Sequence, residues 1–302
     1  MKVVITGANS AVGQAILRCG AAQRTMPTVL VAAVRSERAA EQIRSRVGDA
    51  NRLVRISYDD PRNLDAALQG TSAVIHLAGI LVETSDSRYE QANVAATRSV
   101  VEAAKRNSVQ KFILVSATGA DETSCNRYYR TKGQAESLLR TSGLCYTVLR
   151  VPLLLGPGTA GAAALQRSVR RRRARLISGG RNLQQPLYVD DLARAAVLAA
   201  TQASIANNLT LNLVGPVSLP ERELVERAAR LLGREVRIGS IPKNLFSWAL
   251  AIRQRISSTG FSRDILEVIT ADTRLDPQPA ACKLGIRLTG VDEMIKDSLG
   301  QG

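Results

Sequence analysis

Aromatic residues and histidine are scarce in this chain of 302 residues, and both scarcities exclude classes of site. Phe, Trp and Tyr make up 3% of the sequence, too little for a surface that stacks single-stranded bases. The one histidine is His76, so a histidine-rich zinc or iron centre cannot form, and a Ser-His-Asp triad would have to use it. We therefore expect no metal site and no nucleic-acid partner.

Paired cysteines and long apolar runs are missing as well. The four cysteines are far apart and form no C-x-x-C pair, which argues against a zinc ribbon, a redox motif or a disulfide scaffold and fits a reducing compartment. Arg150 interrupts the apolar stretch 146–155, so no segment is expected to span a membrane. The first residues indicate a strand and a turn rather than a signal peptide. The expected location is cytoplasmic.

Positive charge is abundant instead. Lys and Arg number 41 against 26 Asp and Glu, a formal net charge of +15. This excess favours an anionic partner, such as a phosphorylated ligand, a nucleic acid or an anionic membrane surface, and of these the scarcity of aromatic residues weighs against the nucleic acid. Hydrophobic residues make up 45%, enough for a chain of this length to bury a core without disulfides or metals.

Short apolar runs alternate with helical patterns through the first half of the chain. The runs predict strands over residues 2–6, 29–34, 53–56, 73–78, 111–116 and 146–151. The helical patterns lie over residues 12–19, 37–47, 63–69, 93–106 and 131–141. Strands that are apolar on both faces and separated by helices predict a parallel sheet covered on both sides. The expected fold class is α/β, a doubly wound parallel sheet of the Rossmann type.

The pattern changes after Pro152. A breaker cluster at 156–158 precedes an expected arginine-rich helix over 166–176, and later elements over 187–201 and 209–214 suggest a return to the sheet. We therefore expect an NAD(P)-binding domain from 1–157 and 184–214. A smaller, discontinuous substrate lobe is expected from 158–183 and 215–302.

A phosphate-binding turn follows the first expected strand. The segment combines two glycines with small or polar residues, namely Gly7, Asn9, Ser10, Ala11, Val12 and Gly13. A strand precedes it and a helix follows it, as a dinucleotide site requires. The amides at the start of that helix would receive a pyrophosphate. Arg35 ends the second strand where an NAD site would carry an acid, so it favours NADP and leaves NAD open.

Tyr128 and Lys132 form a Tyr-x-x-x-Lys pair after the fifth strand. On a helix these positions share one face, so the ammonium is expected to lower the pKa of the phenol. Such a tyrosine can pass a proton to or from a carbonyl or alcohol oxygen while a nicotinamide moves hydride. Lys132 could also bind the nicotinamide ribose.

The turn resembles those of the short-chain dehydrogenase/reductase superfamily, although Ser10 or Ala11 replaces a middle glycine. The resemblance implies that Leu77, Ala78 and Gly79 line the cofactor and that Asn93 is the family's helix asparagine. It also places Ser57 where the family has an adenine-binding Asp, with Tyr58 beside it. The family serine falls at Ala117, so the flanking Ser116 or Thr118 is the candidate carbonyl polariser. His76 could simply be packed and hydrogen-bonded.

The short interval between Ser116 and Tyr128 resembles the atypical branch of extended short-chain dehydrogenases. That branch includes the NAD(P)H-binding 39 kDa accessory subunit of respiratory complex I. Together with the P-x-Y-V-x-D-x-A-like segment at 186–193, the resemblance covers residues 1 to about 235. It implies an NADP(H)-dependent oxidoreductase or epimerase-like enzyme acting on a small molecule. The alternative is an NAD(P)H-binding accessory subunit or redox-sensing regulator without turnover.

The remaining basic and apolar segments leave their roles open. Arg170, Arg171, Arg172 and Arg173 could recognise an anionic substrate group or a lipid headgroup, or could form a solvated helix face. Residues 245–256 are apolar and then basic, which would suit peripheral membrane contact or a core helix of the substrate lobe.

Overall fold

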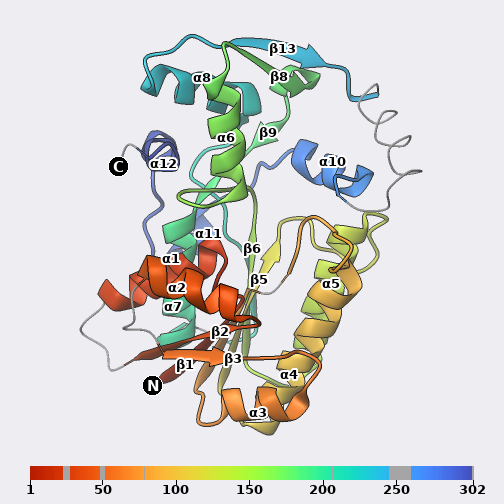
Figure 1. Cartoon of the computed structure of the whole chain (residues 1–302), viewed down its shortest axis with the longest axis vertical. Helices are drawn as coiled ribbons and strands as arrows, with labels where there is room; N and C mark the ends of the chain where they lie inside the picture. The colour runs from red at the N-terminus through yellow and green to blue at the C-terminus, as the bar shows by residue number, and fades with distance from the viewer. Residues whose placement is uncertain (23–27, 48–51, 78, 206, 245–259, 301–302) are drawn as a thin grey trace.

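A seven-stranded parallel sheet forms the centre of the computed structural model, which describes residues 1–22, 28–47, 52–77, 79–205, 207–244 and 260–300 (Figure 1). Its strand order is β11-β6-β5-β4-β1-β2-β3. The strands are β1 (Lys2–Thr6), β2 (Val29–Val34), β3 (Arg52–Arg55), β4 (Ala73–His76), β5 (Lys111–Ala117), β6 (Tyr146–Val151) and β11 (Leu209–Asn212). This order, with crossovers on both sides of β1 and β4, confirms the doubly wound fold expected from the sequence.

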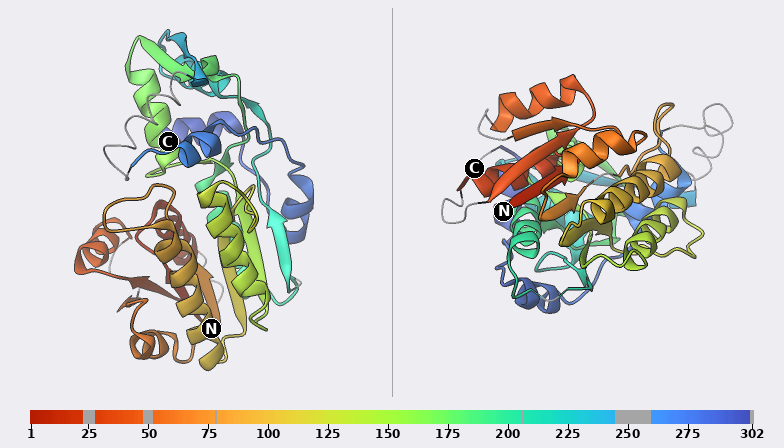
Figure 2. Two further views of the ribbon diagram at one scale, coloured as in Figure 1. Left: turned by 90° about the vertical axis from the view of Figure 1, so that its right-hand side faces the viewer. Right: turned by 90° about the horizontal axis from the view of Figure 1, so that it is seen from below.

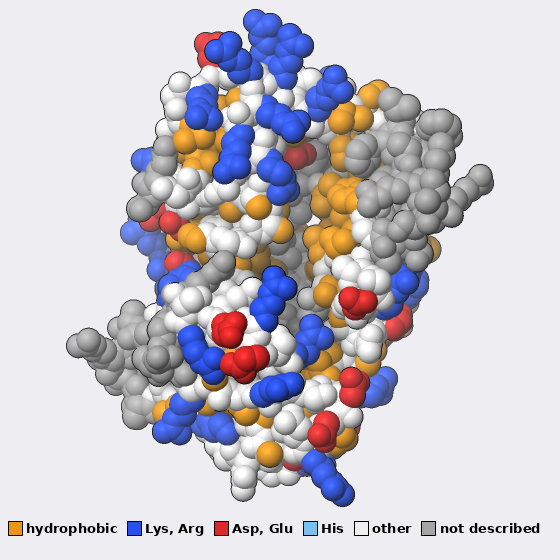
Figure 3. Space-filling model, viewed as in Figure 1, with side chains coloured by type: hydrophobic (Ala, Val, Ile, Leu, Met, Phe, Trp, Pro, Cys, Tyr) orange, Lys and Arg blue, Asp and Glu red, His pale blue; other side chains and the backbone are white. Residues whose placement is uncertain are grey.

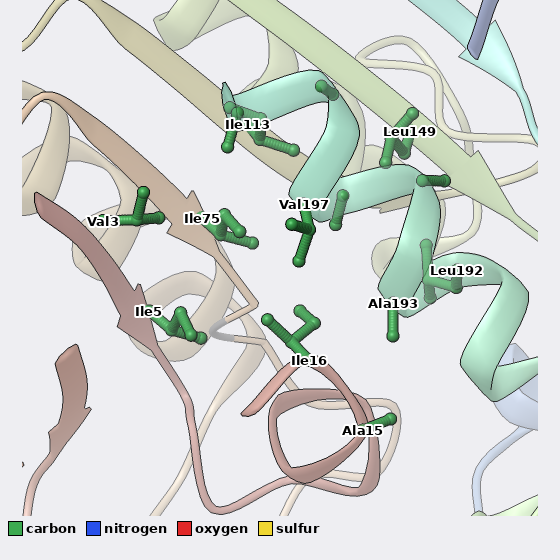
Figure 4. Close-up of a cluster of buried hydrophobic side chains, with 14 of the residues drawn as sticks. Val3, Ile5, Ala15, Ile16, Ile75, Ile113, Leu149, Leu192, Ala193 and Val197 are labelled. Carbon is green, nitrogen blue, oxygen red and sulfur yellow. The ribbon is translucent and has the colours of Figure 1, made fainter. Parts of the chain in front are cut away.

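Helices cover both faces of this sheet. The first face carries α1 (Ala11–Ala22), α2 (Glu37–Val47) and α7 (Val189–Thr201), and the second carries α3 (Pro61–Leu68), α4 (Ala96–Arg106) and α5 (Arg127–Arg140). Successive residues of β1 point to opposite faces, so Val3 and Ile5 enter the first core and Val4 the second. Figure 4 shows Ile16 of α1 and Val197 of α7 packed over this first face. Burial on both faces explains why the strands are apolar throughout.

Side-chain caps fix where several helices begin. The Asp60 carboxylate accepts the Arg62 and Asn63 amides ahead of α3, and Pro61 occupies the first helical position. The Asn126 side chain accepts the Tyr128 and Tyr129 amides ahead of α5. These residue types satisfy amides that a helix cannot satisfy itself. Helix α5 therefore starts at Arg127, earlier than the residue-131 start that periodicity indicated.

The rest of the chain forms a second part above the carboxyl ends of the strands (Figure 2, left). It has its own apolar core beneath α6, α8 and α12. Its helices are α6 (Ala160–Arg170), α8 (Glu221–Leu231), α10 (Arg263–Thr270) and α12 (Val291–Ser298). Helix α11 (Gln278–Leu284) instead packs against α7 and β11 of the sheet part, where Ala280 and Leu284 join the first core. The short strands of the second part pair as β10 (Leu187–Tyr188) with β7 (Leu154–Leu155), β12 (Leu219–Pro220) with β9 (Leu183–Gln184), and β13 (Arg237–Ile241) with β8 (Arg173–Ile177).

The arginine run does not lie on one helix, so the expected helix over 166–176 is wrong. Helix α6 ends at Arg170, and β8 begins at Arg173. From Arg173 to Leu176 exposed arginines alternate with buried apolar residues, which is the period of a strand with one buried face. The segment 245–256 lies outside the described residues.

No helix in the described part of the chain is long and apolar enough to cross a bilayer. The same residues contain no group of three or more His, Cys, Asp or Glu side chains placed to hold a metal ion. All four cysteines carry free thiols: Cys19, Cys125, Cys145 and Cys282.

Candidate functional site

The turn between β1 and α1 has the geometry of an anion cradle. Gly7 has a φ of 71°, in the region that glycine adopts without strain. A Cβ atom at Gly13 would lie 2.4 Å from the Ala8 carbonyl oxygen, so only glycine allows the helix this close to the strand end. The Ser10 hydroxyl accepts the Gly13 amide at 3.1 Å. This bond satisfies one of the unpaired amides in the first turn of α1.

The remaining first-turn amides are free to receive a ligand. The amides of Ala11 and Val12 have no acceptor inside their own helix, because the first turn never does. Asn9 and Ser10 are exposed beside them. A Cβ atom at Gly158 would lie 3.7 Å from that of Ala11, so the 156–158 turn comes down to the cradle. These features fit a pyrophosphate held at the start of α1.

Arg35 and Tyr58 meet beyond the ends of β2 and β3. The guanidinium of Arg35 lies 5.9 Å from the centre of the Tyr58 ring, and Arg35 is exposed. Burial raises the pKa of Tyr58, so the ring remains a neutral platform. Arg35 forms no ion pair with any described residue. The structure brings the two residues into contact, and their expected place at the adenosine end of a dinucleotide stays a prediction.

His76 is a structural residue. Its side chain is fully buried, and its ring nitrogens contact the Thr6 hydroxyl at 2.7 Å and the Thr97 hydroxyl at 3.1 Å. Burial lowers the pKa of His76 to about 3, and Lys132 adds to the shift. The imidazole is therefore neutral at pH 7 and links the end of β1 to α4. This confirms the expectation that His76 is packed and hydrogen-bonded.

A π-helix brings Asn93 to the carboxyl edge of the sheet. This segment, η1 (Glu90–Ala95), leads directly into α4. The side-chain oxygen of Asn93, Oδ1, accepts the backbone amide of Ile80 at 2.9 Å, and its side-chain nitrogen, Nδ2, donates to the Thr131 hydroxyl at 3.0 Å. π-turns of this kind are frequent at functional sites. Here the wide turn joins the segment after β4 to α5. Of that segment, Leu77 donates its amide to Thr6, and Ala78 lies outside the described residues.

Lys132 lies beside Asn93, under the segment after β4. Its ammonium donates to the Val115 carbonyl at 2.9 Å and lies 3.6 Å from where a Gly79 Cβ would stand. Only 6% of the residue is exposed. Burial lowers the pKa of Lys132 to about 8, although the Glu136 carboxylate opposes the shift. A buried ammonium held against a carbonyl at the sheet edge is placed to bind a polar ligand.

The expected lowering of the Tyr128 pKa by Lys132 is wrong for this structure. Burial raises the pKa of Tyr128 well above 10, and the neighbouring Tyr129 and Tyr89 phenols reinforce the rise. The three rings pack together: the centre of the Tyr128 ring lies 5.7 Å from the centre of the Tyr129 ring and 5.9 Å from that of Tyr89. The Lys132 amine bonds to Val115 instead. Tyr128 therefore keeps its proton at neutral pH.

The two candidate hydroxyls differ in access. Ser116 is 3% exposed, and its hydroxyl has no hydrogen-bond partner among the described residues. Its position in β5 matches that of Phe112 and Leu114, which face the second core. Thr118 is half-buried just past the strand, and its amide donates to the Val151 carbonyl. Ala117, where the family serine would stand, is buried.

A clamp around the start of α5 was not evident in the sequence. The buried Glu83 carboxylate forms two bonds to the Arg127 guanidinium, at 2.9 and 3.1 Å, and accepts the Tyr89 amide. The buried Asn126 amide group donates to the Asp264 carbonyl and the Glu267 carboxylate. These contacts tie α10 and the loop before η1 to the helix of Tyr128. Only Asn126 carried a local signal, as a favoured cap residue.

Comparison with known proteins agrees with this geometry. Residues 7–181, more than half of the chain, match the model of a family described as NAD(P)H-binding. Ceramide reductase of Caulobacter vibrioides is 26% identical over 241 residues, covering 80% of this chain and 73% of that protein. Subunit 9 of the NADH dehydrogenase 1 alpha subcomplex of Arabidopsis thaliana is 28% identical over 184 residues. That alignment spans 60% of this chain and 46% of the subunit.

Solved structures share the fold over the whole chain. UDP-glucuronic acid 4-epimerase from Bacillus cereus, in complex with UDP-glucuronic acid and NAD, superimposes with a TM-score of 0.76 at 18% identity. The match covers 100% of this chain and 98% of the epimerase chain. The cradle, the sheet order and the matched model lead to one assignment. The chain belongs to the NAD(P)H-binding family.

Proposed function

We propose that this chain is an NADP(H)-dependent oxidoreductase that acts on a carbonyl or alcohol by Tyr-Lys acid/base chemistry. The observation that supports this most is the meeting of Gly79, Asn93 and Lys132 at the carboxyl edge of the sheet, beside the cradle of α1. In open α/β sheets, ligands bind at this edge. Residues 1–157 and 184–214 would hold the cofactor, and 158–183 with 215–302 the substrate.

The preference for NADP rests on Arg35. An exposed guanidinium without an ion pair in the described structure, stacked on Tyr58, suits a ribose 2′-phosphate. Arg35→Ser should weaken NADPH binding roughly tenfold to a hundredfold and leave NADH binding unchanged. Arg38→Ser, another exposed arginine at the start of α2, is the matched control. Equal affinity of the wild type for NADPH and NADH would contradict the preference.

The proposed chemistry uses side chains in three positions. When bound, the nicotinamide supplies or accepts the hydride. Tyr128 is a neutral phenol at pH 7 and can donate its proton to a carbonyl oxygen that is being reduced. Lys132 would bind a ribose hydroxyl from the Val115 edge, and Thr118 is the accessible hydroxyl that could polarise the substrate oxygen. The protonated phenol is the form that reduction of a carbonyl requires, whereas oxidation of an alcohol would require the phenolate.

Replacement of Tyr128 tests this mechanism. Tyr128→Phe should lower turnover by about 10²- to 10⁴-fold while NADPH binding stays within twofold. Tyr129→Phe, one residue along and stacked on the same ring, should keep turnover near that of the wild type. The starting panel takes its substrates from the names of similar proteins: ceramide-type ketones for reduction with NADPH, and UDP-sugars, which are alcohols, for oxidation with NADP. Equal turnover of Tyr128→Phe and the wild type would exclude Tyr128 as the acid.

A second candidate function is NADPH binding without turnover, as in an accessory subunit or a redox-sensing regulator. The burial of Ser116 and the alanine at position 117 favour it, because both remove the family's serine contact. It is also consistent with the similarity to the Arabidopsis subunit. NADPH bound tightly but oxidised with none of the panel would support this candidate. NADPH oxidation that depends on Tyr128 would exclude it.

A further inference from the structure

The outer end of the second part contains a hollow lined by arginines. Its volume is about 870 Å³, and it opens where α6 and α8 end. The lining consists mainly of two short segments, Val169, Arg170, Arg171, Arg172 and Arg173 from the first and Gly233, Arg234, Glu235 and Arg237 from the second. Figure 3 shows Lys and Arg side chains gathered at this end of the molecule. We call it the arginine hollow.

Strand pairing builds this hollow. Arg173 of β8 stands opposite Arg237 of β13, and the Arg237 amide donates to the Arg172 carbonyl at 3.0 Å. Along β8 the residues Ala174 and Leu176 face the core under α6 and α8, which leaves Arg173 and Arg175 on the outer face. Two segments that are far apart in sequence therefore present their guanidinium groups side by side.

The charges of the hollow are not balanced within the protein. Nearby in α8, Arg222 pairs with Glu226, and Arg227 pairs with Glu223. None of the six arginines that line the hollow forms an ion pair with a described residue, and Glu235 is the one carboxylate of its lining. Like charges directly opposite each other on paired strands are destabilising. A bound anion would remove that repulsion.

We propose that the arginine hollow binds a soluble ligand carrying two or more phosphate groups. Guanidinium forks bind phosphate oxygens in pairs, and the volume lies in the range of small-molecule sites. None of the lining residues belongs to the cradle of α1, Arg35 or the α5 edge, so this site is separate from the cofactor site. It does not depend on the proposed enzyme activity.

The surroundings favour a small ligand over a membrane or a nucleic acid. Membrane-surface sites combine cations with exposed apolar side chains. The large exposed hydrophobic side chains of the described residues are Met1, Val29, Val82, Val217 and Leu275, and none lines the hollow. Among the described residues no aromatic side chain lines it either, so these residues do not offer the stacking that single strands need.

Calorimetric titration with tripolyphosphate tests the proposal. The wild-type protein, with NADPH added to occupy the cofactor cradle, should bind one tripolyphosphate. Arg173→Gln/Arg237→Gln should bind it at least about tenfold more weakly, through the loss of two charge-assisted contacts. Arg274→Gln/Arg287→Gln removes the same charge from two other exposed sites and should change affinity less than about twofold.

Three results would overturn the proposal. The first is no binding of tripolyphosphate, and the second is an equal loss in the two double variants, which would indicate net charge alone. The third is binding that the Arg173→Gln/Arg237→Gln protein retains, which would place the anion elsewhere. Vesicles of phosphatidylglycerol and a short DNA duplex serve as competitors. Displacement of tripolyphosphate by either at lower phosphate concentration would assign the hollow to that macromolecule instead.

Discussion

The sheet and the outer end of the molecule treat charge in opposite ways. In the sheet part, the Glu136 carboxylate is fully buried and bonds to Arg140 at 2.9 Å and to Arg150 at 2.6 Å. In the arginine hollow, six guanidinium groups meet a single carboxylate. A charge inside the protein must be balanced by the protein itself, because water cannot solvate it. A charge at the surface can remain unbalanced until a ligand arrives.

Removal of Glu136 should give the largest effect on stability. Glu136→Gln leaves Arg140 and Arg150 without their carboxylate, and we expect the free energy of unfolding to fall by about 3 kcal/mol. Glu226→Gln breaks a pair that is exposed on α8 and should change it by less than about 0.5 kcal/mol. Urea unfolding of both variants measures the difference. Equal losses would remove the contrast between the two parts.

His76 should make the sheet part sensitive to acid. Its pKa is about 3 in the folded protein against 6.5 when unfolded, so the unfolded chain binds one more proton between these values. Stability from this residue is complete above pH 6.5 and is lost as the pH falls toward 3. Between pH 7 and pH 5 the loss should be about 2 kcal/mol. In urea unfolding, the free energy of unfolding of His76→Gln should change less between pH 7 and pH 5 than that of the wild type. An equal change in the two proteins would contradict the role of His76 in this acid sensitivity.

Lys132 should lower stability in exchange for function. Its pKa is about 8 in the folded protein against 10.5 unfolded, so below pH 8 the folded protein holds a charge that burial disfavours. Lys132→Met should raise the free energy of unfolding by about 1–2 kcal/mol at pH 7 and abolish turnover. The gain in stability should shrink as the pH rises from 8 toward 10.5, so most of it is lost at pH 10. Thermal melts at pH 7 and pH 10 check the sign, and a destabilised variant at pH 7 would refute it.

Substitutions in the arginine hollow should show the smallest effect on stability, and this effect should be a gain. Without a ligand, Arg173→Gln/Arg237→Gln removes a repulsive cross-strand pair and should stabilise the protein by a few tenths of a kcal/mol. The gain should be larger in low salt, where repulsion is less screened. Melting temperatures in dilute and concentrated NaCl measure it. A clear loss of stability would mean that these arginines support the fold.

Periodicity and turn chemistry were sufficient to predict the sheet and the cradle. Both signals are local: apolar runs bounded by glycine, and a small-residue turn between a strand and a helix. The division of the chain into domains and the roles of the site residues remain predictions. The prediction of a helix over 166–176 was wrong because it followed the arginine-rich composition. The alternation of exposed and buried residues that is typical of a strand is visible in Arg173, Ala174, Arg175 and Leu176.

Other features depend on contacts between distant segments. Whether Ser116 faces the ligand or the core is set by which side of β5 it occupies, and a shift of one residue reverses that. The π-turn that carries Asn93 has the composition of an ordinary helix. The bond between Lys132 and the Val115 carbonyl, which keeps the amine from the Tyr128 phenol, forms across 17 residues. None of these leaves a mark in the local sequence.

The return of the chain to the sheet has a consequence for biosynthesis. Residues 1–151 supply six of the seven strands, but α7 (Val189–Thr201) and the edge strand β11 (Leu209–Asn212) follow the excursion into α6 and β8. Helix α7 packs against α1 over the first face of the sheet. In a nascent chain that has left the ribosome only as far as residue 180, α1 and α2 already cover part of this face, but the apolar area that α7 covers is still exposed. That interval of synthesis is when aggregation or chaperone binding should compete with folding.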